Sequence, residues 1–116
     1  MAASQYNGPL GGRLILIVQR TWIVARQLSA AFEAEGARVL AAHDVASALL
    51  SADAPDLAAA VLDSGSAELC RQLGQRGIPS VLYTARTQID DDCAGAPVVK
   101  KPAPVAEVVE AIRRLL

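Results

Sequence analysis

Three side chains of different chemistry stand at or directly after the ends of short apolar runs in this sequence. They are the carboxylate of Asp63, the hydroxyl of Thr84 and the amine of Lys101. An amine close to a carboxylate favours its ionised form, and an ionised carboxylate can act as a nucleophile. The three can therefore form a reactive site if the fold brings the ends of their runs together.

The run that ends in Asp63 is the centre of the chain. It reads Leu-Ala-Ala-Ala-Val-Leu-Asp over residues 57–63, with Pro55 before it and Gly65 after it. This length is typical of a strand and too short for an independent helix. A strand that is apolar on both faces favours a parallel sheet covered by helices on both sides. Asp63 then emerges at the carboxyl edge, where open α/β sheets keep their sites.

Helical and extended patterns alternate along the rest of the chain. Helical spacing of apolar residues, with Thr21 as the expected hydroxyl cap and Gly36 as the stop, predicts the first helix. Asp44 is expected to cap the second helix, and Ser64 or Ser66 the third. The region 85–96 loses periodicity and has room for one short helix at most. The predicted strands are 13–18, 38–42, 57–62, 80–84 and 98–101, and the predicted helices are 21–36, 44–50, 64–77 and 103–116.

This alternation predicts an α/β domain with a five-stranded parallel sheet, because such short connections allow only right-handed crossovers. The carboxyl ends of parallel strands lie at one edge of the sheet. We therefore expect Gln19 and Arg20, Asp63, Thr84 and Lys101 to converge at that edge.

Read together, these positions resemble the receiver domain of bacterial two-component response regulators. The residues that carry the resemblance are Val-Leu-Asp at 61–63, Tyr-Thr-Ala at 83–85 and Lys-Lys-Pro at 100–102, and the similarity extends from Arg13 to Leu116. The resemblance implies a three-layer, flavodoxin-like, doubly wound fold with strand order 2-1-3-4-5. The aperiodic stretch after the fourth strand predicts that the fourth helix of this fold is short or missing.

The resemblance also implies roles for individual residues. Asp63 would accept a phosphoryl group from a phosphohistidine, Thr84 would hydrogen-bond the phosphoryl oxygens, and Lys101 would pair with the acyl phosphate. Gly65 and Pro102 would line the site, with a cis peptide bond before Pro102. The partner would be a sensor histidine kinase or a phosphotransfer protein, and a homodimer is also compatible with the family.

One family feature is absent. Receivers carry an acidic pair after the first strand that holds magnesium, whereas here Ile-Leu-Ile-Val leads directly into Gln19 and Arg20. Magnesium keeps its waters unless carboxylates or phosphates compensate, so we expect weak binding or none, and no metal site. Two hypotheses remain open for Arg20. Its guanidinium could replace the ion and clamp phosphoryl oxygens, or its pairing with Asp63 could mimic a neutralised site permanently.

Composition excludes several function classes. The net charge of -1, with acids and bases intermingled, predicts no binding to nucleic acid or to a membrane surface. No apolar run is long enough to span a bilayer. Residues 1–12 lack a secretory signal pattern, which predicts a flexible tail before a single domain at 13–116 and a cytoplasmic location. In that reducing compartment Cys70 and Cys93 are expected to be thiols without chemistry.

A second function is compatible with the same fold. Gln19 and Arg20 favour a phosphorylation-independent pseudo-receiver, an interaction module that binds a partner through helix 21–36, Trp22 and helix 103–116. Val98 stands where the family often carries an aromatic residue coupled to the threonine, which also argues against a conventional switch. No acid–base pair or nucleophilic triad is present, so we expect no enzyme activity beyond self-phosphorylation and its hydrolysis.

Overall fold

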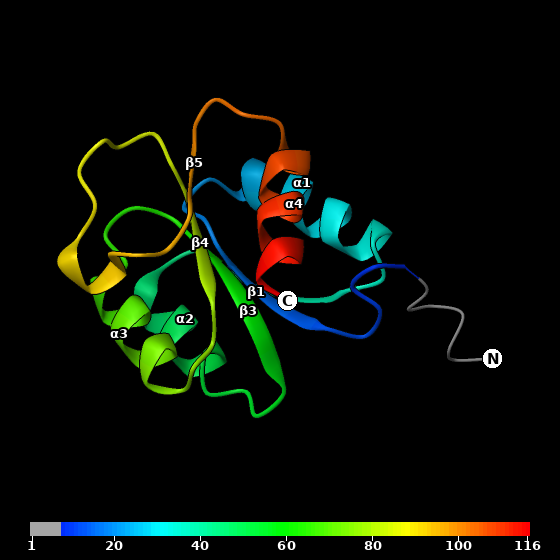
Figure 1. The fold of residues 1–116 in the computed structure, drawn as a ribbon, viewed down its shortest axis with the longest axis horizontal. Helices are drawn as coiled ribbons and strands as arrows, with labels where there is room; N and C mark the ends of the chain where they lie inside the picture. The colour runs from blue at the N-terminus through cyan, green and yellow to red at the C-terminus, as the bar shows by residue number, and fades with distance from the viewer. Residues whose placement is uncertain (1–7) are drawn as a thin grey trace.

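The computed structural model describes residues 8–116. They form one five-stranded, all-parallel sheet in the order β2-β1-β3-β4-β5, with helices on both faces (Figure 1). The predicted fold and strand order are therefore confirmed. The strands are β1 (Leu14–Val18), β2 (Arg38–Ala42), β3 (Leu57–Leu62), β4 (Ser80–Thr84) and β5 (Val98–Lys100). The helices are α1 (Trp22–Ala34), α2 (Val45–Ser51), α3 (Ala67–Gln75) and α4 (Val105–Leu115).

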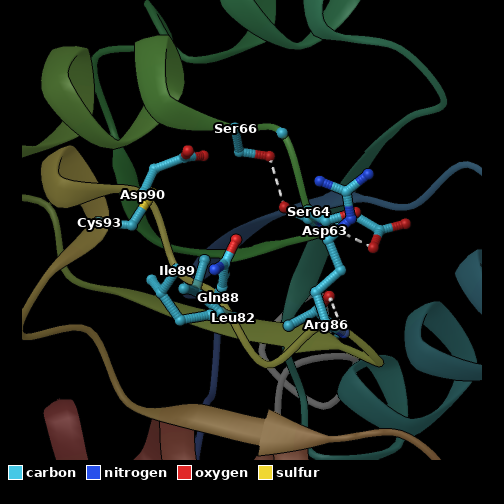
Figure 2. A pocket seen from close by; sticks show the side chains of 11 residues that line it. Asp63, Ser64, Ser66, Leu82, Arg86, Gln88, Ile89, Asp90 and Cys93 are labelled. Atoms are coloured by element: carbon cyan, nitrogen blue, oxygen red, sulfur yellow. Dashed lines mark hydrogen bonds between the residues drawn. The ribbon is translucent and has the colours of Figure 1, made fainter.

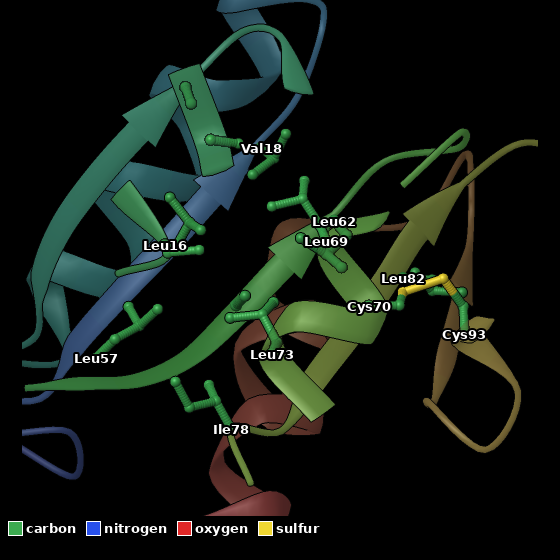
Figure 3. Packing of buried hydrophobic residues seen from close by; sticks show 14 of the residues in the cluster. Leu16, Val18, Leu57, Leu62, Leu69, Cys70, Leu73, Ile78, Leu82 and Cys93 are labelled. Carbon is green, nitrogen blue, oxygen red and sulfur yellow. A yellow bond between two sulfur atoms is a disulfide. The ribbon is translucent and has the colours of Figure 1, made fainter. Parts of the chain in front are cut away.

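Each face of the sheet has its own apolar layer. On one face α1 and α4 pack together, burying Phe32, Leu28 and Ile112 against Ile15 and Ile17 of β1. On the other face α2 and α3 cover Leu16 of β1 and the neighbouring strands (Figure 3). Every residue of β1 is buried because both faces are covered, which explains why this strand is a continuous apolar run.

The segment between β4 and β5 has no α-helix. Its one helical turn is the 3-10 turn η2 (Asp91–Cys93), so the prediction of a short or missing fourth helix is confirmed. Cys93 of this turn forms a disulfide with Cys70 of α3, with an S–S distance of 2.03 Å (Figure 3). The prediction of free thiols is therefore wrong. It depended on local spacing and an expected reducing compartment, whereas the fold brings together two cysteines 23 residues apart.

Residues 8–12 differ from the predicted flexible tail. They form a turn in which Leu10 is only 2% exposed and packs into the layer under α1. The backbone N–H of Leu10 donates to Glu35 O (2.9 Å), and that of Gly12 donates to Gly36 O (2.9 Å). The folded part thus begins before Arg13. The rest of the predicted tail, residues 1–7, lies outside the described residues.

Of three expected helix caps, one forms and two do not. Asp44 caps α2 as expected, accepting from the backbone N–H of Ser47 at 2.7 Å. Thr21 precedes α1 but makes no capping hydrogen bond through its hydroxyl. Ser66 precedes α3, and its hydroxyl donates instead to the backbone carbonyl of Asp63 at 2.7 Å. Within residues 8–116, no helix combines the length and the apolar character that crossing a membrane requires.

Candidate functional site

The side chains that directly follow β1, β3 and β5 contact one another. Strand pairing aligns Ile17 of β1 with Val61 of β3, so the residues that follow these strands lie at the same level. The Nζ of Lys101 is 3.8 Å from Oδ1 of Asp63 and donates a 2.9 Å hydrogen bond to Oε1 of Gln19. The predicted convergence of Gln19, Asp63 and Lys101 is what the structure shows.

The carboxylate of Asp63 is largely shielded and held by the backbone. Its side chain is 13% exposed. Oδ1 accepts from the N–H of Ser64 at 2.8 Å, while Oδ2 accepts a longer bond from the N–H of Arg20 at 3.4 Å. The two carboxylate oxygens therefore differ in their contacts. Oδ1 accepts the shorter hydrogen bond and lies near Lys101, whereas Oδ2 accepts only the longer one.

Thr84 ends β4 and is 2% exposed. Its Oγ1 accepts from the backbone N–H of Arg86 at 3.1 Å. Asp63, Gly65, Thr84 and Arg86 line the same pocket. Figure 2 labels Asp63 and Arg86 in it. The remaining lining residues come from the turn between β3 and α3, from β4 and from the segment after β4: Ser64, Ser66, Leu82, Gln88, Ile89, Asp90 and Cys93.

The guanidinium of Arg20, a residue that follows β1, contacts the turn after β3. Its Nη2 contacts the carbonyl of Ser64 at 3.4 Å, and it lies 3.1 Å from where a Cβ on Gly65 would stand. Gly65 has a φ of 76°, a conformation that side-chain-bearing residues rarely adopt. A glycine here thus permits both the turn and the close approach of Arg20.

Of the predicted site residues, Asp63, Gly65 and Thr84 line this pocket, and the others do not; these are Gln19, Arg20, Lys101 and Pro102. The peptide bond between Lys101 and Pro102 is cis, as the resemblance implied. Sequence reasoning missed Arg86, whose side chain extends along the pocket wall near Asp63 in Figure 2. The available signal was its position two residues beyond Thr84, at the same sheet edge.

Solved structures with this architecture come from several prokaryotes. A receiver domain protein (CheY-like) from Methanospirillum hungatei JF-1 has a TM-score of 0.79 and 20% identity, covering 90% of this chain and 94% of that one. The chemotaxis protein CheY4 of Vibrio cholerae, crystallised at low pH, has a TM-score of 0.79 and 18% identity, covering 91% of this chain and 100% of that one. This chain has the response-regulator receiver fold. No family model and no curated protein sequence matches it.

A third receiver structure bears on the metal question. The response regulator protein TrrA of Thermotoga maritima, solved in complex with Mg(2+)-BeF, has a TM-score of 0.77 and 21% identity, covering 90% of this chain and 99% of that one. In the present chain, the described residues contain no group of three or more His, Cys, Asp or Glu side chains that could hold a metal ion. Asp63 supplies the one carboxylate among the strand-end residues that meet, beside an amide and a guanidinium. Magnesium is usually bound by one or two carboxylates together with substrate phosphates, so this donor set suits it poorly and weak or absent binding stays a prediction.

The first helix of the receiver fold exposes apolar side chains near the site. Trp22 is 55% exposed and Ile23 is 53% exposed. The guanidinium of Arg26 lies 5.4 Å from the centre of the Trp22 ring, a cation–π arrangement. Trp22 is the single tryptophan of the chain and begins α1 two residues after Arg20, which makes it a spectroscopic reporter for this part of the site.

Proposed function

We propose that this chain is a receiver domain of a two-component phosphorelay that accepts a phosphoryl group on Asp63. The donor would be a phosphohistidine on a sensor histidine kinase or a phosphotransfer protein. The observation that carries the proposal is the Asp63 carboxylate 3.8 Å from Lys101 Nζ at the carboxyl edge of a receiver fold. Thr84 in the same pocket supplies the hydroxyl. A cytoplasmic location stays a prediction.

The contacts of Asp63 suggest how the transfer would proceed. Oδ2 would attack phosphorus as the P–N bond of the phosphohistidine breaks, leaving the electron pair on the imidazole nitrogen. Oδ1 would stay oriented by the Ser64 N–H and by Lys101. Since the hydroxyl of Thr84 accepts from Arg86, its own hydrogen remains to donate to a phosphoryl oxygen. The new acceptor oxygens would thus alter the contacts of Thr84 and Lys101.

The test is covalent labelling by acetyl phosphate, read by intact mass and by peptide mapping. We expect a phosphoryl adduct on the wild type and none on Asp63→Asn. Asp90→Asn is the matched control, because it removes a second carboxylate from the same pocket and should leave labelling intact. Label retained by Asp63→Asn would refute the assigned acceptor. A wild type that takes no label from acetyl phosphate or from a phosphorylated kinase would refute phosphoacceptance, and the interaction module would then be the better description.

A further inference from the structure

The polar groups around Asp63 are mostly hydrogen-bond donors. Gln19 is fully buried, and because its Oε1 is used by Lys101, its amide Nε2 is left as a buried donor with no partner among the described residues. The guanidinium of Arg20 and the amine of Lys101 carry further N–H groups. A divalent cation needs acceptor oxygens, whereas an oxyanion needs donors. The donor set at this sheet edge therefore favours an anion.

The charges around the pocket point the same way. Arg86 lines the pocket, Lys101 Nζ is 3.8 Å from Asp63, and the guanidinium of Arg20 contacts the carbonyl of Ser64, against the pocket carboxylates of Asp63 and Asp90. The site therefore carries an excess of positive charge before any ligand binds. A cation held by Asp63 would meet the amine of Lys101, which lies 3.8 Å from Oδ1, as a like charge.

Two contacts hold Arg20 against the turn that follows β3. Its backbone N–H contacts Asp63 Oδ2, and its Nη2 contacts the carbonyl of Ser64, so both ends of the residue touch the turn that carries the acceptor. The 3.1 Å approach to Gly65 depends on the missing Cβ there. Because a guanidinium is planar and always charged, it can pair with two phosphoryl oxygens at once.

We propose that this site binds a phosphoryl-type dianion without a divalent cation, with Arg20 supplying the charge that a metal ion would otherwise provide. For the covalent step this rests on the proposed function: acetyl phosphate would transfer its phosphoryl group to Asp63 as the P–O bond to acetate breaks and acetate leaves. Gln19 orients Lys101 without adding negative charge. Arg20 then pairs with the phosphoryl oxygens.

Labelling by acetyl phosphate, with excess magnesium or with EDTA, tests the covalent part. We expect equal labelling of the wild type in both buffers. Arg20→Ala should lose roughly tenfold or more in EDTA, the size expected for one charge-assisted contact. Arg13→Ala, an exposed arginine at the opposite end of β1, is the matched control and should behave as wild type. Magnesium-dependent labelling of the wild type would overturn the inference and leave the proposed function standing.

A variant with an acidic pair after β1 provides a sharper test. The double variant Gln19→Asp with Arg20→Asp places two more carboxylates beside Asp63 and removes the guanidinium. We expect its labelling to be lost in EDTA and restored by magnesium, since three carboxylates suit a hard cation. Labelling of the double variant in EDTA at the wild-type level would overturn the role assigned to Arg20.

A binding measurement separates this inference from phosphoacceptance. Trp22 fluorescence would be followed while inorganic phosphate is added in EDTA to the wild type, Arg20→Ala and Arg13→Ala. We expect a saturable change in the wild type and in Arg13→Ala, with affinity weakened roughly tenfold or more in Arg20→Ala. This result supports the anion site even if no label forms. A wild type that gives no saturable change, or that responds only with magnesium, would overturn the inference.

Discussion

The two faces of the sheet are covered in different ways. On one face, α1 with 13 residues and α4 with 11 residues pack against the strands and against each other. On the other face, α2 has seven residues, α3 has nine, and the next covering segment is a single 3-10 turn. The Cys70–Cys93 disulfide joins that turn to α3 (Figure 3).

The second face adds side-chain links to its apolar packing. Arg76, at the end of α3, donates to the carbonyls of Ala52 and Ala54 after α2. Gln72 of α3 donates to the side chain of Asp53 at 2.9 Å. The pocket beside Asp63 lies on this face, between the turn that precedes α3 and the segment after β4. Functional segments are commonly drawn from such less regular parts held on a rigid scaffold.

The largest effect is expected on the helix-packed face. Phe32 of α1 is fully buried between α1, α4 and the sheet. Phe32→Ala should lower the free energy of unfolding by about 3–5 kcal/mol, because it removes a large apolar side chain and leaves a cavity. Urea unfolding followed by circular dichroism measures the change. Leu50→Ala, at a residue 79% exposed on α2, is the control and should be nearly neutral; equal losses in both variants would contradict the packing described here.

Opening the disulfide should have the next largest effect. Cys70→Ser combined with Cys93→Ser frees a loop with a sequence separation of 23, and loop entropy predicts a loss of about 3 kcal/mol. Urea unfolding in oxidising buffer measures it. The wild type in a dithiol reductant should unfold like the double variant, with two titratable thiols appearing on reduction. If reduction exposed both thiols and left the unfolding midpoint unchanged, the link would have no stabilising role.

Removing the Arg76 contacts should cost less. Arg76→Met keeps much of the apolar stem but leaves the carbonyls of Ala52 and Ala54 to solvent. We expect a loss of about 1 kcal/mol, because each net hydrogen bond is modest and the side chain is exposed. Arg71→Met is the matched control: its 3.9 Å contact with Asp92 joins two exposed groups and should contribute almost nothing. A larger loss from Arg71→Met than from Arg76→Met would reverse this ranking.

The smallest effect is a pH dependence at the start of α2. The hydrogen bond from the Ser47 backbone lowers the pKa of Asp44 below its ordinary value. The folded state therefore gains stability from the ionised carboxylate above the unfolded pKa, and this gain is lost as pH falls through the lowered pKa. Asp44→Asn keeps a capping oxygen and should flatten the acid-side decline of stability. Thermal unfolding from neutral to acidic pH measures both slopes; identical slopes would exclude Asp44 as a contributor.

Much of this fold was predictable from local pattern. The bounds of β2 and β4 match the prediction, because alternation between short apolar runs and turn residues is a local signal. The cap at Asp44 follows from its side chain and backbone alone. The predicted hydroxyl cap at Thr21 is absent, because several conformations at a helix start satisfy the same residue type. The burial of Leu10 depends on an apolar layer made by distant segments.

The sequence by itself determined that an acid, a hydroxyl and an amine stand at strand ends. The length of a strand and the polar residue at its end depend on the local sequence alone. Only the tertiary structure decided that Lys101 reaches Gln19 across 82 positions, and that Arg20 lies over Gly65. It also decided that Cys70 faces Cys93. Such contacts depend on how whole elements pack and twist against one another, and no short stretch of residues encodes that geometry.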